Sequence, residues 1–430
     1  MSSPTKPRGL VAVAGLLLAI GVAVVVLVVV SAASTRDRPA PIPAVPAPQL
    51  SPGPPPQLPQ ASKPPPPPAD DPWPFYGYNL ARTRLFAPAG NLIPPFHVGW
   101  RYWDGALLEF PPVIYNNTLY FEDANGWASA VSTTHGRLLW HTRIGSLAAA
   151  SPALDIRHQL VFFALLSRSP GARVPGNGAL VAVSMRTGKV AWSHALPAGT
   201  ESSPLVHGLS VFLGDQSGSV YSFRTYDGHL NWAFQANGAV KGGVAFAHNT
   251  LYFGDYGARV HAISAADGHE YWSAGGGDSF YSTPAVAFGR VYIGSTSGAV
   301  YAFWANSGAT SWTASTGAYV YASPAVANIP YVGPTVYIGS YDGHLYSYDA
   351  DSGAPRWSHG GGGKIDGSAT VVGNVVYYSS LGSNTTTGLD WRTGRQVFSF
   401  DDGEFTPVIT DGKAVFLIGY ATIYQMLPKR

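Results

Sequence analysis

A pattern of short, alternating apolar runs with a period of about 40 residues recurs along most of the chain. In its clearest copy, residues 282–312, runs at 285–288, 291–294 and 300–304 precede a glycine that lies four residues before a tryptophan. Runs this short indicate β-strands, and several strands per 40-residue unit are typical of a β-propeller. The closing aromatic residues lie 52, 40, 40, 40, 45 and 41 residues apart, at Trp140, Trp192, Trp232, Trp272, Trp312, Trp357 and Phe398.

The number of blades follows from the two ends of this array. Seven complete units run over 106–146, 147–197, 198–237, 238–277, 278–317, 318–362 and 363–401. The stretch 405–427 after them has three strand-like runs and no closing tryptophan, whereas the run 96–103 before them is one strand in excess. Pairing the two closes the ring and removes the sheet edge that each end would expose. The sequence therefore predicts an all-β, eight-bladed β-propeller of four-stranded antiparallel blades, closed by an N-terminal strand.

Three positions of the repeat are explained by the needs of the fold. Most units begin with a pair such as Ser323-Pro324, and proline suits the first residue of a strand, where no backbone donor is needed. The glycine before each closing aromatic residue suits a hairpin turn with positive φ. Because the aromatic residues recur at one position in each unit, we expect them to pack between blades. This blade-docking set is Trp100, Trp140, Trp192, Trp232, Trp272, Trp312, Trp357 and Phe398.

The N-terminal residues are expected to export and space the propeller. Residues 1–8 are basic and precede an apolar stretch, 9–31, that is long enough to cross a bilayer as one helix with its N-terminus in the cytoplasm. A cleaved secretory signal is the alternative. Residues 32–74 are rich in proline and cannot form a core, so they form either a semi-rigid spacer or a docking site for a proline-binding module. Whether residues 9–31 are a retained membrane span or a cleaved signal, we expect residues 75–430, the propeller, to lie on the extracytoplasmic side of a cell membrane.

Composition excludes several classes of function. The chain is 46% apolar and only 12% charged, and its net charge of +2 gives no support to nucleic-acid binding. It has no cysteine, which excludes disulfides, thiol catalysis, thiolate metal sites and a lipid-anchored cysteine.

The repeat carries further signature runs. These are Val-Tyr-x-Gly at 291–294 and 336–339, and Gly-x-Val/Leu-Tyr at 218–221 and 298–301, beside the Ser/Thr-Pro starts and Gly-x-x-x-Trp ends. With them the chain closely resembles the pyrroloquinoline-quinone-like (PQQ-like) propeller repeat, over about residues 96–427. The resemblance implies a family that contains quinone-dependent dehydrogenases, the non-catalytic lipoprotein propeller of the outer-membrane barrel assembly machine, and membrane-tethered sensor domains. The fold does not choose among them.

Candidate chemistry lies where the innermost strand of each blade starts beside the central channel. The position three residues before each opening proline, or its equivalent, should face that channel. In contrast to the rest of the repeat, this position holds four carboxylates and a lysine. Around the ring it is occupied by Glu109, Ala149, Glu201, Lys241, Tyr281, Tyr321, Asp366 and Glu404, and we expect all but the alanine to form a ligand-binding channel mouth.

The neighbours in this ring suggest how it would work. Asp366, Glu404 and Glu109 come from consecutive blades, so they would bind a cation such as Ca²⁺ or a hydrogen-bonding ligand, or else be solvated in a wide channel. Glu201 and Lys241 are neighbours that would form an ion pair.

Two segments outside the repeat are expected to cover parts of the ring. Residues 73–92 are aromatic, carry Arg82 and Arg84, and should lie over the propeller as a strap. The insertion 167–178 would either form a lid on the channel mouth or be a surface loop.

No catalytic constellation emerges from the sequence. Quinone-dependent alcohol dehydrogenases typically use an adjacent cysteine pair, which this chain lacks. We therefore expect a membrane-anchored, non-catalytic binding or scaffold module of the bacterial cell envelope, with another envelope protein or a ligand as its partner and no cofactor. A PQQ-dependent dehydrogenase, or a ligand sensor that uses the acidic mouth, is the alternative.

Overall fold

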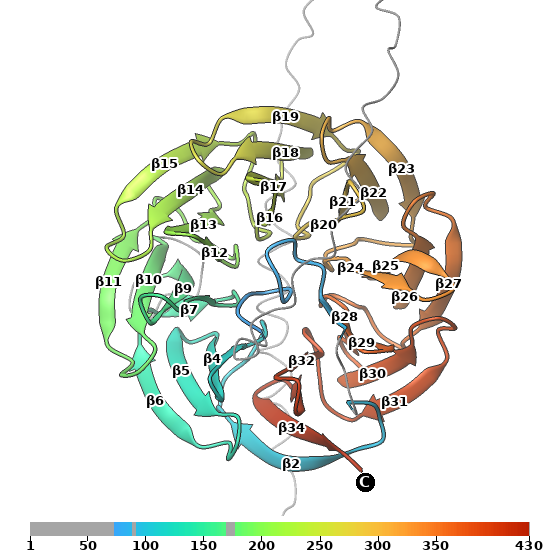
Figure 1. The fold of residues 1–430 in the computed structure, drawn as a ribbon, viewed down its shortest axis with the longest axis horizontal. Helices are drawn as coiled ribbons and strands as arrows, with labels where there is room; N and C mark the ends of the chain where they lie inside the picture. The colour runs from blue at the N-terminus through green and yellow to red at the C-terminus, as the bar shows by residue number, and fades with distance from the viewer. Residues whose placement is uncertain (1–72, 88–91, 169–176, 430) are drawn as a thin grey trace, which may run out of the picture. The chain divides into compact units, whose positions relative to one another are not determined.

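The computed structural model describes residues 73–87, 92–168 and 177–429. In this part of the chain, eight sheets form a ring around a central axis, and every regular element is a β-strand (Figure 1). The predicted membrane span and the proline-rich segment before Trp73 lie outside the described residues. Within the described ranges, no helix has the length and apolar character needed to cross a membrane.

The blades are numbered in chain order, and the strands of each blade run from the axis outward. Blade 1 contains β3 (Val113–Tyr115), β4 (Thr118–Glu122), β5 (Trp127–Ser132) and β6 (Leu138–Arg143). Blade 2 contains β7 (Leu147–Ala148), β8 (Ala153–Asp155), β9 (Leu160–Ser167), β10 (Ala179–Ser184) and β11 (Val190–Ala195). Blade 3 contains β12 (Leu205–His207), β13 (Ser210–Gly214), β14 (Ser219–Arg224) and β15 (Leu230–Gln235). Blade 4 contains β16 (Ala245–Ala247), β17 (Thr250–Gly254), β18 (Arg259–Ser264) and β19 (Glu270–Gly275).

The remaining blades repeat this plan. Blade 5 contains β20 (Ala285–Ala287), β21 (Arg290–Gly294), β22 (Ala299–Trp304) and β23 (Thr310–Ser315). Blade 6 contains β24 (Ala325–Ile329), β25 (Gly333–Gly339), β26 (His344–Asp349) and β27 (Pro355–Gly360). Blade 7 contains β28 (Thr370–Val372), β29 (Val375–Ser380), β30 (Thr385–Asp390) and β31 (Gln396–Phe400), with β1 (Leu85–Phe86) parallel to β28. Blade 8 contains β32 (Val408–Thr410), β33 (Val415–Ile418), β34 (Thr422–Pro428) and the N-terminal β2 (Phe96–Trp103).

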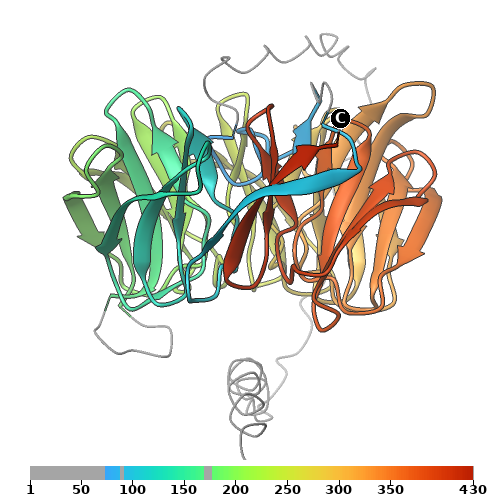
Figure 2. The same ribbon diagram turned by 90° about the horizontal axis from the view of Figure 1, so that it is seen from below.

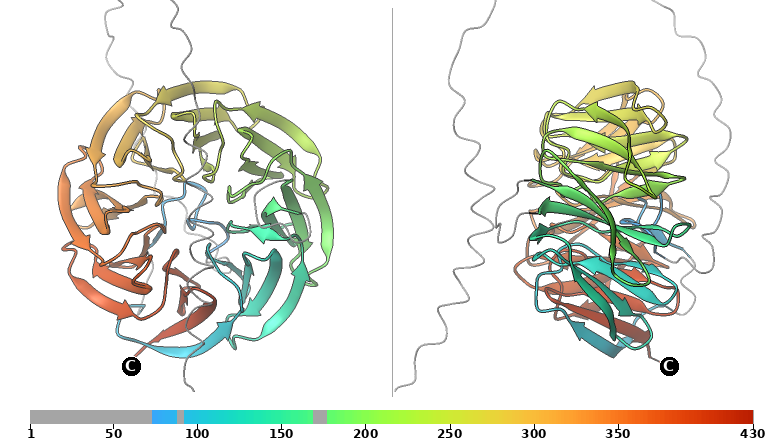
Figure 3. Two further views of the ribbon diagram at one scale, coloured as in Figure 1. Left: turned by 180° about the vertical axis from the view of Figure 1, so that it is seen from behind. Right: turned by 90° about the vertical axis from the view of Figure 1, so that its left-hand side faces the viewer.

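The predicted closure of the ring is confirmed. The strand β2 pairs antiparallel with β34, from Phe96 opposite Pro428 to Trp103 opposite Thr422. Seen from behind, the two strands lie side by side and the ring is continuous (Figure 3). The eighth blade is thus built from both ends of the propeller.

The repeated tryptophan and glycine meet across seven of the eight junctions between blades, and at the eighth Phe398 lies against Phe96. The indole nitrogen of Trp272, for example, donates a hydrogen bond to the Ala305 carbonyl of the next blade, at 3.0 Å. Gly308 of that blade has a φ of 70°, and a Cβ built on it would lie 2.5 Å from the Trp272 ring. The glycine is therefore needed both for its backbone conformation and for the space that the neighbouring indole occupies. Corresponding glycines lie against Trp100, Trp140, Trp192, Trp232, Trp312 and Trp357.

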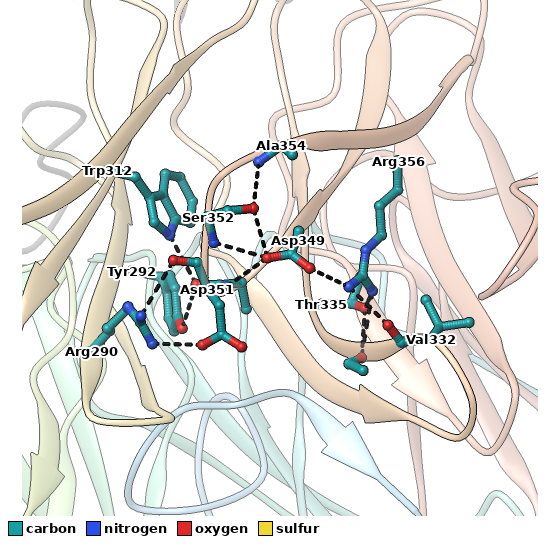
Figure 4. Close-up of polar contacts among 12 residues, drawn as sticks. Arg290, Tyr292, Trp312, Val332, Thr335, Asp349, Asp351, Ser352, Ala354 and Arg356 are labelled. Carbon is teal, nitrogen blue, oxygen red and sulfur yellow. Dashed lines mark hydrogen bonds and ion pairs between the residues drawn. The ribbon is translucent and has the colours of Figure 1, made fainter.

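Polar contacts also join blades 5 and 6 (Figure 4). Arg290, on β21, donates to the side chain of Asp351 at 2.7 Å. The backbone carbonyl of Ala350 accepts bonds from the Trp312 indole at 2.8 Å and from the Tyr292 hydroxyl at 3.1 Å. The turn that follows β26 is thereby fixed against the preceding blade.

Residues 73–87, which we call the strap, occupy one end of the central channel rather than lying over the ring. Figure 1 shows them at the centre of the ring, and Figure 2 places them near its upper face. Carbonyl groups of the strap accept hydrogen bonds from inner-strand amides of blades 1, 2, 4, 5, 6 and 7. The Arg82 guanidinium adds bonds to the carbonyls of Ser203 and Pro204 in blade 3, each at 3.1 Å. The strap therefore makes hydrogen bonds to seven of the eight blades, and its apolar side chains share a core cluster with residues of the eighth.

Candidate functional site: an acidic and phenolic cup

The starts of the inner strands surround a recess with about 490 Å³ of empty space, partly open to solvent, which we call the cup. Six of the seven predicted site residues line it, namely Glu109, Glu201, Lys241, Tyr281, Tyr321 and Asp366. Each belongs to the connection that enters an inner strand, and each is partly buried. The one position of this ring that we expected not to bind, Ala149, is buried and does not line the cup.

The seventh residue, Glu404, is not among those that line the cup. The connection into blade 8 is held by Asp402, whose carboxylate accepts bonds from the Tyr424 hydroxyl at 2.8 Å and from the Tyr420 amide at 3.2 Å. As a result, Phe405 and Thr406 take the place at the cup that Glu404 was expected to fill.

Glu201 is the most firmly held side chain of the cup. One carboxylate oxygen accepts a bond from the Gln216 amide at 2.6 Å and lies 3.4 Å from the Lys241 ammonium. The other oxygen accepts a bond from the Tyr281 hydroxyl at 2.7 Å. The predicted ion pair with Lys241 is therefore present, within a network of three partners.

One side of the cup is an arc of tyrosine rings. The rings of Tyr281 and Tyr321 lie 5.1 Å apart, and those of Tyr321 and Tyr341 lie 4.9 Å apart. Tyr319 extends the arc outward and is 55% exposed. Lys241 lies over the ring of Tyr256 at 5.2 Å. Tyr341, Tyr256 and Tyr319 were missed by the sequence reasoning, because they are not at the repeat position that was followed around the ring.

The strap closes the bottom of the cup. Tyr76 lines the cavity and donates or accepts a hydrogen bond with Ser368 at 2.8 Å. The serine and threonine residues of the repeat starts link the blades here: the Thr283 amide donates to the Ser323 hydroxyl at 3.0 Å, and the Ser323 amide to Ser368 at 2.9 Å. This gives a reason for the hydroxyl before each proline that the sequence reasoning did not identify. The cup is thus a closed recess and not a through-channel.

Burial and mutual repulsion perturb the carboxylates of the cup. Burial, followed by the charges of Glu201 and Asp366, raises the pKa of Glu109 to about 8. Burial also raises the pKa of Asp366 to about 6, against a hydrogen bond from Tyr341 that lowers it. A positive charge placed beside these two groups would favour their ionised forms.

Within the described ranges, no group of three or more histidine, aspartate and glutamate side chains is arranged to hold a metal ion. This includes Glu109, Asp366 and Glu404. The insertion 167–178 connects β9 to β10 on the cup side, and its residues 169–176, on which the lid hypothesis depends, lie outside the described part of the chain.

A family model described as "Outer membrane protein assembly factor BamB" matches residues 124–240 and 216–426. The chain belongs to this PQQ-like propeller family. No curated protein sequence matches the chain. The match to the family model confirms the family resemblance that the repeat predicted.

Solved structures of the same fold include members with different roles. BamB from Moraxella catarrhalis is 15% identical, covers 78% of this chain and 99% of its own, and has a TM-score of 0.65. The quinohemoprotein alcohol dehydrogenase of Comamonas testosteroni is 14% identical, covers 83% of this chain and 82% of its own, and has a TM-score of 0.66. A computationally designed protein, Ika8, is 14% identical, covers 76% and 97%, and has a TM-score of 0.63. At these identities the likeness shows the fold alone, and this fold occurs both in BamB and in an alcohol dehydrogenase.

Proposed function

We propose that this chain is a membrane-anchored, extracytoplasmic propeller that acts as a non-catalytic binding module of the bacterial cell envelope, with the cup as its contact site for a partner protein. The observation that carries the proposal is the closure of the channel by the strap beneath a recess lined with acids and phenols. Such a recess suits a side chain that enters from a partner's surface. Family membership supports the same role, since the matching model is described as an assembly factor.

The charge of the cup indicates what the partner contributes. Glu201 already has Lys241, Gln216 and Tyr281 as partners. Glu109 and Asp366 have no ion pair within the described residues. A lysine or arginine side chain would pair with these two carboxylates and pack against the tyrosine arc, because cations bind favourably over aromatic rings.

The absence of a quinone cofactor is part of this proposal. PQQ is a tricarboxylate, and three of the four charged groups that line the cup are carboxylates. The fourth, Lys241, lies beside Glu201. The lining therefore does not suit a trianionic ligand. Adding PQQ and calcium to the purified full-length chain should give neither a bound chromophore nor dye reduction with alcohols or sugars, and either signal would support the dehydrogenase alternative.

The contact site can be tested in cells with a photo-crosslinking amino acid in the full-length chain. Tyr319 lies on the rim of the cup, whereas Tyr331, in the turn between β24 and β25 of the same blade, lies on the opposite side and is fully exposed. We expect position 319 to give one discrete protein adduct, which is weakened by Glu109→Gln with Asp366→Asn, and position 331 to give none. The same adduct from both positions, or no adduct from either, would contradict the proposal.

A further inference from the structure

A second cavity, with about 220 Å³ of empty space that is partly open to solvent, adjoins the cup and shares Tyr76, Ser368 and Thr406 with its lining. Its walls come from the strap and from the inner parts of blades 1, 7 and 8. The polar side chains that line it carry hydrogen-bond donors, and no carboxylate lines it. They are Trp73, Tyr76, Arg84, Ser368, Thr370 and Thr406.

Two of these donors are deeply buried and unused. Arg84 is only 2% exposed, and its Nη1 donates to the carbonyls of Arg82 at 2.8 Å and Pro324 at 3.2 Å. Its Nη2 has no acceptor among the described residues. The same is true of the indole nitrogen of Trp73, which is 1% exposed. Buried donors without an acceptor are costly, so both atoms point to a missing acceptor.

No carboxylate pairs with Arg84 within the described residues, and the ionisable oxygen that interacts with it is the Tyr76 hydroxyl. Arg82, its neighbour, is fully buried, and its hydrogen bonds within the described ranges go to backbone carbonyls. No carboxylate forms an ion pair with either guanidinium in this part of the chain. Burial, and then the charge of Arg84, lower the pKa of Arg82 to about 9. Two adjacent buried cations require compensation.

We propose that this second cavity is a binding site for one monatomic anion of the chloride class, held by Arg84 Nη2 together with donors from Trp73, Thr370 and Thr406. Arg84 is the one charged residue that lines the cavity, beside neutral donors, so the lining suits a monovalent, monatomic ion better than a phosphate or an organic acid. The bound anion neutralises the arginine pair and attaches the strap to blades 1, 7 and 8. The site adjoins the cup, but no carboxylate of the cup lines it, and it does not depend on the function proposed for the cup.

The site can be located directly with bromide, which replaces chloride and scatters anomalously. Crystals of the full-length chain grown or soaked in sodium bromide should show an anomalous peak within hydrogen-bonding distance of Arg84 Nη2. In parallel, thermal unfolding is followed in sodium chloride and in sodium gluconate at equal ionic strength. We expect the midpoint to rise by roughly 2 °C for each tenfold increase in chloride above the dissociation constant, and to be lower in gluconate.

Variants separate this site from general effects of salt. Arg84→Met should abolish the difference between chloride and gluconate, and Thr370→Val should reduce the bromide occupancy if the first variant fails to fold. Arg290→Met is the matched control, because Arg290 is also a buried arginine but has Asp351 as its ion-pair partner. This control should unfold earlier and keep the dependence on chloride.

Three results would overturn the proposal. The first is equal unfolding midpoints in chloride and gluconate, and the second is a water molecule without anomalous signal beside Arg84. The third is an absorbance band near 295 nm from an ionised tyrosine in the native protein at neutral pH, lost in Tyr76→Phe. In that case Tyr76 itself would supply the negative charge. Its ring lies 4.5 Å from the Arg84 guanidinium. The positive charge of Arg84 lowers the pKa of the Tyr76 hydroxyl, whereas burial raises it.

Discussion

Trp312→Phe and Trp357→Phe make the same chemical change at two neighbouring blade junctions, yet they should differ in cost. The Trp312 indole donates to the Ala350 carbonyl at 2.8 Å. The indole nitrogen of Trp357 is buried and has no acceptor within the described part of the chain. Both rings lie against the turn glycine of the next blade, with the nearest ring atom 2.7 Å from a Cβ built on Gly353 or Gly394.

The difference between the two variants isolates the hydrogen bond. Each loses the same apolar part of the indole, so that contribution largely cancels. Trp312→Phe also loses a bond worth about 0.5–1.5 kcal/mol net, while Trp357→Phe removes an unsatisfied donor whose burial costs about 1–3 kcal/mol. We therefore expect Trp312→Phe to lower the free energy of unfolding by about 2 kcal/mol more than Trp357→Phe does.

Urea unfolding followed by far-ultraviolet circular dichroism measures this difference, because that signal does not depend on the mutated fluorophore. The two variants must share one m-value, so that a shift of the midpoint reports stability alone. Equal shifts, or a larger loss for Trp357→Phe, would refute the view that the indole nitrogen contributes to docking. The repeated tryptophan would then act through its apolar surface only.

Three further predictions concern the cup and the ring. The pKa of Glu109 is raised to about 8 in the folded state, so the folded chain binds this proton more tightly than the unfolded chain does. The free energy of unfolding should therefore fall as the pH rises from about 5 to 8. Glu109→Gln should flatten that fall in urea titrations. Gly308→Ala should cost at least about 2 kcal/mol in the same assay, from positive φ and contact with Trp272, whereas Gly275→Ala, which meets nothing within 4 Å, should cost little. Millimolar calcium should leave the thermal midpoint unchanged, since no metal-binding group of side chains is found within the described residues.

The ring could be predicted from sequence because its determinants are local and repeated. The last unit, 405–427, lacks one strand, and the run 96–103 is one strand in excess. This predicted that the two ends would pair, as β2 and β34 do. The cup could be predicted in the same way, since one repeat position per blade faces the axis. Six of seven predicted residues line it for this reason. Glu404 was predicted to face the cup but does not line it, and in its loop Asp402 bonds to Tyr420 and Tyr424 of blade 8.

The strap could not be placed from sequence. It has no periodicity, and arginine is usually exposed, so Arg82 and Arg84 indicated a surface segment. Both side chains are instead buried, and both residues have a left-handed backbone conformation, with φ of 58° and 54°. Their acceptors are carbonyls at the starts of inner strands, such as Ser203 and Val244. These carbonyls converge only when the ring has closed, so no local pattern encodes their position.

The contacts that hold the ring together leave the cup positions free to vary. In seven of the eight junctions the repeated contact joins the closing tryptophan to the turn glycine of the next blade. At several repeat starts the hydroxyl before the proline also bonds to the neighbouring blade. The residue three positions before that proline is not part of this repeated set, although some of these residues contact each other across blades, as Glu201 and Lys241 do. It is a glutamate in blade 1, an alanine in blade 2, a lysine in blade 4 and a tyrosine in blade 5. The repeat therefore constrains these positions less than it constrains the closing aromatic residue and the turn glycine, and their residue types differ from blade to blade.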